Sequence, residues 1–116
     1  MGRSVYLNGE YLDEADARVS VFDRGFLFSD GVYEVVSVLE GKLIDFEGHC
    51  RRLARSLSEL GMSSPISDED LLEVHRQLVR RNGVEEGVVY LQITRGAEDR
   101  DFAWSEDLAP TIVLFT

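Results

Sequence analysis

Apolar positions at the start of the chain predict a β-hairpin followed by shorter elements. Val5–Leu7 and Tyr11–Leu12 flank Asn8-Gly9, two turn residues that tolerate positive φ, which is the pattern of a tight hairpin. A short strand is expected around Arg18–Val21. The glycine-punctuated stretch 22–31 contains several aromatic residues and is expected to form an ordered loop or a single helical turn.

Four further strands are predicted along the rest of the chain. Val32–Leu39 is rich in β-branched residues and is expected to be a central strand that returns through Lys42–Ile44. Residues 88–94 alternate between an apolar face and a mixed face, which is typical of a half-buried strand. A polar loop, Arg95–Pro110, then leads into the apolar strand Thr111–Thr116.

Two helices are predicted between these strands. Apolar residues recur at helical spacing from Phe46 to Leu60, and Gly61 stands where a left-handed C-terminal residue is expected. Ser67 followed by Asp70 is a helix-capping pattern, and it opens a second amphipathic helix that ends at Asn82-Gly83. The order of elements predicts an α+β fold, a mostly antiparallel sheet with two helices packed on one face.

Composition and charge restrict the function. A chain of 116 residues is the size of one domain, and 22 acidic against 12 basic residues give a net charge of −10. This charge argues against general binding of nucleic-acid backbones or anionic membranes. The single cysteine and the lack of a signal peptide or membrane-spanning run favour a cytoplasmic location.

Several residue types offer little chemistry. No cysteine or histidine cluster has metal-ligand spacing, so no metal site is expected. Cys50 lies on the apolar stripe of its helix and is read as a buried structural thiol. His49 and His75 have no evident nucleophilic partner, and Lys42, the only lysine, follows a hairpin turn and is a poor candidate for a covalent cofactor link.

The arginines are more informative. On a helical wheel Arg52 lies beside the apolar stripe, on the flank of His49 and Ser56, where it is placed to hold a bound phosphate. A surface ion pair of Arg52 with Glu59 or Glu47 is the alternative. Arg95 and Arg100 bracket a loop at the end of a strand, and they are placed either to receive a substrate carboxylate or to be neutralised by the acidic residues at 98, 99 and 101. Tyr33 and Tyr90 lie in strand patterns, where an aromatic residue usually serves packing.

Three motifs together resemble a known family. Val19–Val35, His49–Ser56 and Tyr90–Gly96, which continues to Phe102, are similar to consecutive signatures of the fold-type IV, pyridoxal-phosphate-dependent aminotransferases. The third motif is more similar to the D-amino-acid aminotransferase branch than to the branched-chain or aminodeoxychorismate lyase branches. The resemblance covers essentially the whole chain and implies the N-terminal small domain, residues 1–116, of a two-domain enzyme.

The resemblance implies roles for individual residues. Arg52 matches the arginine that binds the phosphate of pyridoxal 5'-phosphate, and Tyr33 matches the tyrosine on the substrate side of the cofactor. Val35 and Ser37 share the strand face of Tyr33 and are expected to line the same pocket.

The carboxylate site shows one departure from the family. Tyr90 and Arg100 match residues that hold the substrate α-carboxylate, contributed in that branch across the interface of a homodimer. Phe102 replaces the usual histidine, and it leaves the preferred amino acid undetermined.

The implied activity is amino-group transfer between a D-amino acid of the D-alanine type and a 2-oxo acid. In this family the lysine that links the cofactor comes from a second domain, so we expect no catalytic residue in this chain, a gene that continues past Thr116, and no activity of the 116 residues alone. A branched-chain or (R)-amine transaminase, or an aminodeoxychorismate lyase, is the alternative on the same fold. A stand-alone binding or dimerisation domain without catalysis is the alternative from another class.

Overall fold

The computed structural model describes residues 2–116 and contains six strands and three helices. The strands are β1 (Ser4–Leu7), β2 (Glu10–Asp13), β3 (Gly31–Leu39), β4 (Lys42–Leu43), β5 (Glu86–Thr94) and β6 (Thr111–Phe115). The helices are α1 (Arg24–Phe28), α2 (Phe46–Glu59) and α3 (Asp68–Arg81). These bounds agree with the expected elements in all but a few places.

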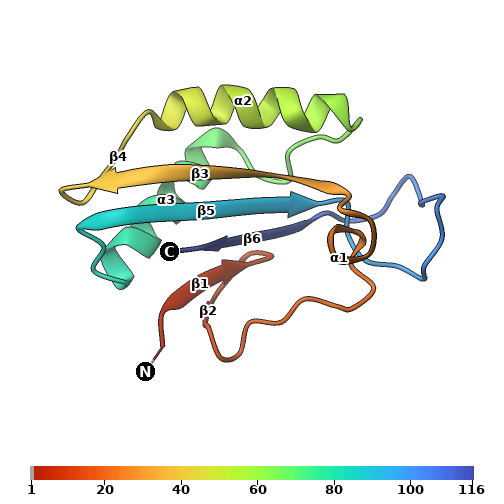
Figure 1. Cartoon of the computed structure of the whole chain (residues 1–116), viewed down its shortest axis with the longest axis horizontal. Coiled ribbons are helices and arrows are strands. Elements are labelled where there is room, and N and C mark those ends of the chain that lie inside the picture. Colours follow the sequence, from red (N-terminus) through yellow and green to blue (C-terminus); the bar gives the residue numbers. More distant parts are fainter. Residues whose placement is uncertain (1) are drawn as a thin grey trace.

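All six strands form one sheet in the order β2-β1-β6-β5-β3-β4, and each neighbouring pair is antiparallel. The β1–β2 turn is the predicted hairpin, with positive φ at Asn8 and Gly9. β6 returns from the far end of the chain to lie between β1 and β5, as Figure 1 shows. The expected α+β fold is therefore confirmed.

The region before β3 differs from the prediction. The strand expected around Arg18–Val21 is wrong, because these residues have no regular structure and Val19 and Val21 are 47% and 66% exposed. Because neither valine is buried, the alternation of residues 18–21 brings no apolar side chain into the core. The next segment does form the expected short helical element, α1, capped by the side chain of Asp23 on the Gly25 amide at 2.8 Å.

β3 is less central than predicted. It pairs along its whole length with β5, but β4 pairs only with Val38 and Leu39. The outer edge of β3 before Val38 therefore has no strand beside it within residues 2–116. A long β-branched run indicates burial but does not identify the neighbouring strands.

α2 and α3 begin and end where the sequence indicates. Asp45 accepts a hydrogen bond from the Gly48 amide at 3.3 Å, and Ser67 accepts one from the Asp70 amide at 3.1 Å, so each helix has a capped N-terminus. Gly61 ends α2 with a φ of +69°, as expected for a left-handed residue. Each helix is 14 residues long, and no helix among the described residues is long and apolar enough to cross a membrane.

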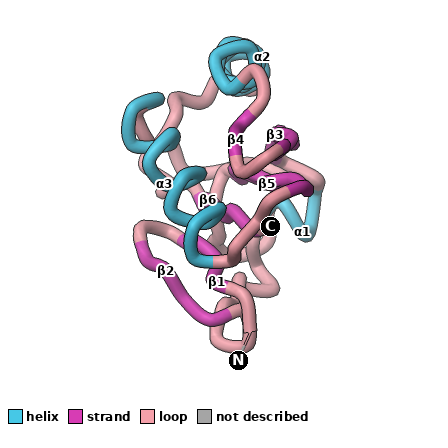
Figure 2. The backbone as a smooth tube through the Cα atoms, turned by 90° about the vertical axis from the view of Figure 1, so that its left-hand side faces the viewer, coloured by secondary structure: helices cyan, strands magenta, loops and turns pink. Residues whose placement is uncertain are grey.

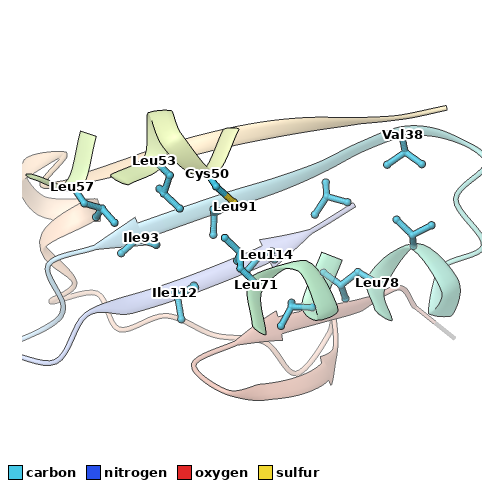
Figure 3. Close-up of a cluster of buried hydrophobic side chains, with 13 residues drawn as sticks. Val38, Cys50, Leu53, Leu57, Leu71, Leu78, Leu91, Ile93, Ile112 and Leu114 are labelled. Atoms are coloured by element: carbon cyan, nitrogen blue, oxygen red, sulfur yellow. The ribbon is translucent and has the colours of Figure 1, made fainter. Parts of the chain in front are cut away.

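The two long helices cover one face of the sheet. Figure 2 shows α3 on the side of the sheet opposite α1, with α2 along the edge formed by β3 and β4. Leucine and cysteine side chains of α2 and α3 meet the buried side chains of β5 and β6 in one core, drawn in Figure 3. The core includes Leu57, Leu78, Leu91, Ile93 and Leu114, each at most 1% exposed. This core leaves the other face of the sheet free of long helices.

Candidate active site

The face of the sheet that is free of long helices carries four of the residues singled out from the sequence. Tyr33, Val35 and Ser37 share this face of β3, because successive strand residues point to opposite sides of a sheet. Tyr90 of β5 stands directly opposite Val35. The rings of Tyr33 and Tyr90 are stacked, with centroids 5.7 Å and planes 13° apart. We call these four residues the tyrosine face.

Gln92 and Phe115, which the sequence patterns did not single out, also contact the tyrosine face. The hydroxyl of Tyr90 donates to Gln92 Oε1 at 3.2 Å, and its ring stacks on Phe115 of β6 at 4.8 Å. Partial burial, and then the neighbouring Tyr33, raise the pKa of Tyr90, so its hydroxyl remains a donor at neutral pH. The two-residue period of β5 is enough to place Gln92 on the same face as Tyr90. The position of Phe115 follows only from the pairing of β6 with β5, which the sequence pattern does not reveal.

Arg52 belongs to a second cluster, built on the buried carboxylate of Glu34. Arg52 Nε and Nη2 donate to Glu34 Oε2 and Oε1, both at 2.8 Å, in a fork-to-fork pair. His49 Nδ1 lies 2.7 Å from the same Oε1. Glu34 is 3% exposed, whereas the side chain of Arg52 is 63% exposed. The surface pairs expected with Glu59 or Glu47 are wrong, because the partner of Arg52 is Glu34 on β3.

The electrostatics of this cluster keep Glu34 ionised and Arg52 charged. Burial alone raises the pKa of Glu34, but the hydrogen bonds from Arg52 and His49 outweigh burial and hold the pKa below its usual value. The bond to Glu34 raises the pKa of Arg52. Because Nε and Nη2 are taken by Glu34, Nη1 is the edge of the guanidinium that faces outward, with no hydrogen-bond partner among residues 2–116. A fixed cation with free N–H groups fits a phosphate dianion.

The two clusters lie on opposite faces of one strand. Tyr33 and Glu34 are consecutive in β3, so one belongs to the tyrosine face and the other points beneath α2. Tyr33 also raises the pKa of Arg52, which places the phenol and the guanidinium within electrostatic range. Arg52 therefore lies at the edge of the sheet where the two faces of β3 meet.

Among the described residues, Arg100 and Phe102 make no hydrogen bond, ion pair or ring contact with either cluster. They belong to the loop between β5 and β6, beside Phe28 of α1, whose ring centroid is 5.6 Å from that of Phe102. The guanidinium of Arg100 lies 5.3 Å and 5.4 Å from the centroids of these two rings. Within one chain the structure does not bring Arg100 to the tyrosine face.

Arg95 is structural. It is 8% exposed, its Nε donates to Asp30 Oδ2 at 2.8 Å, and its Nη2 donates to the carbonyl of Leu60 at 2.8 Å. Its neutralising carboxylate is thus Asp30 and not one of the acidic residues at 98, 99 or 101. A buried, fully engaged arginine is not available to a substrate.

The remaining candidates have structural environments. Burial raises the pKa of the Cys50 thiol to about 11, which makes the buried cysteine inert at neutral pH, as expected. Burial lowers the pKa of His75 to about 4, so its ring is neutral. Lys42 is exposed on β4, the environment expected for a lysine that is a poor candidate for a covalent cofactor link.

Related proteins share both the sequence and the fold. The chain is 41% identical over 113 residues to a D-alanine aminotransferase of Staphylococcus aureus (strain MSSA476), and 34% identical over 112 residues to a D-alanine aminotransferase of Bacillus licheniformis. Each alignment covers 97% of this chain and 40% of the relative. The chain therefore spans about two fifths of the length of these relatives.

Solved structures agree on the fold. The branched-chain amino acid aminotransferase of Escherichia coli superimposes with a TM-score of 0.91 at 18% identity, over 99% of this chain and 39% of that one. The 4-amino-4-deoxychorismate lyase of Pseudomonas aeruginosa superimposes with a TM-score of 0.73 at 27% identity, over 95% and 38% of the two chains. Residues 31–116 match the family described as amino-transferase class IV. Since that match includes both strands of the tyrosine face and the helix of Arg52, the chain belongs to the class IV aminotransferases, as its motifs indicated.

Proposed function

We propose that this chain is the N-terminal domain of a pyridoxal-phosphate-dependent transaminase that moves an amino group between a D-amino acid, of the D-alanine type, and a 2-oxo acid. The observation that carries the proposal is the pairing of Arg52 with buried Glu34 directly behind the stacked tyrosines of β3 and β5. The names of the 34–41% identical relatives support the substrate class. The protein is proposed to be a cytoplasmic homodimer.

Arg52 would hold the cofactor phosphate through the guanidinium edge that Glu34 leaves open. When bound, the cofactor supplies a conjugated ring that accepts electron density from the substrate Cα. The described residues contribute positioning, because the lysine that links the cofactor in this family is expected in a second domain. We therefore expect residues 1–116 alone to be inactive.

The tyrosine face would form the substrate side of the pocket. Tyr33, Val35 and Ser37 would line it. The resemblance implies that Tyr90 acts across the interface of the homodimer, but its ring stacks on Tyr33 of the same chain, so in this proposal its hydroxyl would orient the substrate carboxylate in the pocket of its own subunit. Arg100 is not at this face in its own chain, so it would reach the pocket of the neighbouring subunit in the homodimer. Phe102, which is 76% exposed, would stand beside it in place of the family's histidine.

A second reading on the same fold is a branched-chain or (R)-amine transaminase, or an aminodeoxychorismate lyase. It is supported by Phe102, which offers no hydrogen bond to a carboxylate, and by the similarity of the fold to a branched-chain amino acid aminotransferase and to an aminodeoxychorismate lyase. Assays of the full-length protein with D-alanine and 2-oxoglutarate, with 1-phenylethylamine and with aminodeoxychorismate separate the readings. D-alanine turnover as the best activity supports the first reading, and its absence contradicts it.

A mutation tests the cofactor site directly. We expect Arg52→Gln to weaken pyridoxal phosphate binding by roughly 10- to 100-fold, the loss that follows from charge-assisted hydrogen bonds worth about 1.5–3 kcal/mol. The measurement is titration of the full-length apoprotein with cofactor, followed by absorbance. Arg76→Gln, at an exposed arginine of α3, is the matched control. Equal affinities of the two variants would remove Arg52 from the site.

A further inference from the structure

A buried charge cluster lies between α1 and the loop that follows β5. Arg24 of α1 is 5% exposed and Arg95 is 8% exposed, and the Nε atoms of both donate to Oδ2 of Asp30, at 2.9 Å and 2.8 Å. Burial by itself raises the pKa of Asp30, but the two guanidiniums outweigh it and keep the carboxylate ionised. Two positive charges thus share one negative charge.

Arg24 makes two hydrogen bonds in addition to those that neutralise Asp30. Its Nη1 donates to the carbonyl of Asp101 at 2.6 Å, and its Nη2 donates to the carbonyl of Phe102 at 3.2 Å. The side chains of Asp101 and Phe102 are exposed, so Arg24 holds these residues by their backbone. Asp30 already has Arg95 as a neutralising partner, and the remaining donors of Arg24 serve to fix two consecutive peptide groups of the loop.

The peptide groups that Arg24 fixes are adjacent to Arg100. The 95–110 loop contains no helix or named strand, so bonds of this kind limit where it lies. Phe28, one helical turn after Arg24, supplies the ring beside the Arg100 guanidinium. α1 therefore contacts Arg100 itself through Phe28, and the two residues that follow Arg100 through Arg24.

We propose that Arg24 is a positioning residue for the substrate-carboxylate site: it fixes the backbone at residues 101 and 102 and so determines where Arg100 and Phe102 are presented. The inference rests on the proposed function of Arg100. Arg24 touches neither substrate nor cofactor in this account, and its effect on binding passes through the loop. The family resemblance assigns no role to this cluster.

The chemistry of the cluster explains why arginine is suited to this position. The planar guanidinium has three nitrogens that donate at once, to a carboxylate and to two carbonyls. A lysine at this position would supply one nitrogen and could not serve all three acceptors in the same geometry. Replacement of Arg24 by glutamine leaves Arg95 and Asp30 as a neutral pair, so the buried carboxylate keeps its partner.

The experiment compares Arg24→Gln and Arg24→Lys with the wild type and the control Arg76→Gln, all as full-length holoenzyme. For Arg24→Gln we expect KM for D-alanine to rise about tenfold while kcat changes less than about twofold, the pattern of lost substrate binding. Arg24→Lys should give an intermediate KM. Acetate, a carboxylate that does not react, should bind the Arg24→Gln variant about tenfold more weakly in a direct calorimetric titration, by the same reasoning.

Two readouts separate positioning from a loss of folding. The absorbance of the bound cofactor should be unchanged in Arg24→Gln, and amide hydrogen exchange should accelerate in peptides that span residues 97–104. A KM and an acetate affinity within about twofold of wild type would overturn the proposal, as would unchanged exchange in this loop. A fall in active fraction with an unchanged KM would also overturn it and assign Arg24 to stability alone.

The failure of the proposed function gives a different result. If the wild-type protein does not turn over D-alanine, the proposed activity is contradicted. The acetate and exchange measurements still decide the inference in that case, because neither requires turnover of an amino acid. Loss of carboxylate affinity in Arg100→Gln but not in Arg24→Gln would contradict only the role of Arg24.

Discussion

Buried ionisable side chains determine the chemical character of several positions in this molecule. Glu34 is 3% exposed and ionised only because Arg52 and His49 donate to it, since an unpaired carboxylate at this depth would be neutral. The same pairing restrains a side chain that is otherwise free in solvent. A single buried glutamate thus orients an exposed arginine.

His75 should make stability depend on pH. It is 1% exposed, donates from Nδ1 to the Leu71 carbonyl at 2.8 Å, and has a pKa lowered to about 4 by burial. Between pH 6.5 and 4 the unfolded chain binds a proton that the folded chain does not, so stability is lost as pH falls through this range. The expected loss from pH 7 to pH 4.5 is roughly 2 to 3 kcal/mol from this residue.

Urea unfolding at these two pH values measures the effect of His75. The variant His75→Leu should lose less stability on acidification than the wild type, because the other titrating groups are unchanged. An identical loss in both proteins would mean that folding does not lower the pKa of His75, so that the folded protein carries a protonated His75 at pH 4.5.

Glycines at two ends of the β3–β5 pair form a matched test at the level of the element. A Cβ on Gly31 would lie 2.7 Å from the Ile93 carbonyl oxygen and 3.1 Å from Thr94 Cα, both backbone atoms of β5. A Cβ on Gly87 would meet only a methyl of Val84 at 3.3 Å. We expect Gly31→Ala to destabilise the protein by about 2 kcal/mol and Gly87→Ala by less than about 1 kcal/mol.

Thermal or urea unfolding of the two glycine variants measures the difference. A larger loss for Gly87→Ala than for Gly31→Ala would show that the two strands are not held at the described separation. Only the sign of the difference is needed, since both substitutions add one methyl group to the same pair of strands.

Periodicity was sufficient to predict most of the elements, because α2, α3 and β5 each bury a regular set of side chains. It failed at Arg18–Val21, where the alternating Val19 and Val21 are exposed and lie outside the sheet. The partner of Arg52 was missed for a related reason: Glu34 is on another element, and local patterns do not reveal contacts between elements. The neutralisation of Arg95 by Asp30, 65 residues away, has the same origin.

At the scale of the whole molecule, many apolar side chains are exposed on the face free of long helices, in the segment before β3 and in the loop between β5 and β6. Each of these residues is at least 41% exposed: Val19, Val21, Phe22, Phe26, Tyr33, Val88, Phe102 and Phe115. Soluble monomers seldom expose large apolar patches, so we expect residues 1–116 expressed alone to self-associate. The net charge of −10 opposes this association, and salt should therefore promote it.

Light scattering at low salt and at high salt tests this expectation. An apparent mass that rises with salt and with protein concentration supports it. A monomer at high concentration in both conditions would show that this face tolerates water and is not an interface.

The arrangement of β3 has a consequence for how such a protein diverges. The side chains at the odd-numbered positions from Tyr33 to Ser37 belong to the tyrosine face, while those of Glu34 and Val36 between them point toward the helices. Under the proposed function, substitution at the odd positions would therefore change which substrates fit without disturbing the buried carboxylate or the core, and substitution at the even positions would change the core without altering the substrate pocket. Insertion or deletion of one residue would exchange the two sets. We therefore expect related proteins to differ within this strand by substitutions and not by insertions or deletions. Selection can then act separately on the residues of the tyrosine face and on those that face the helices.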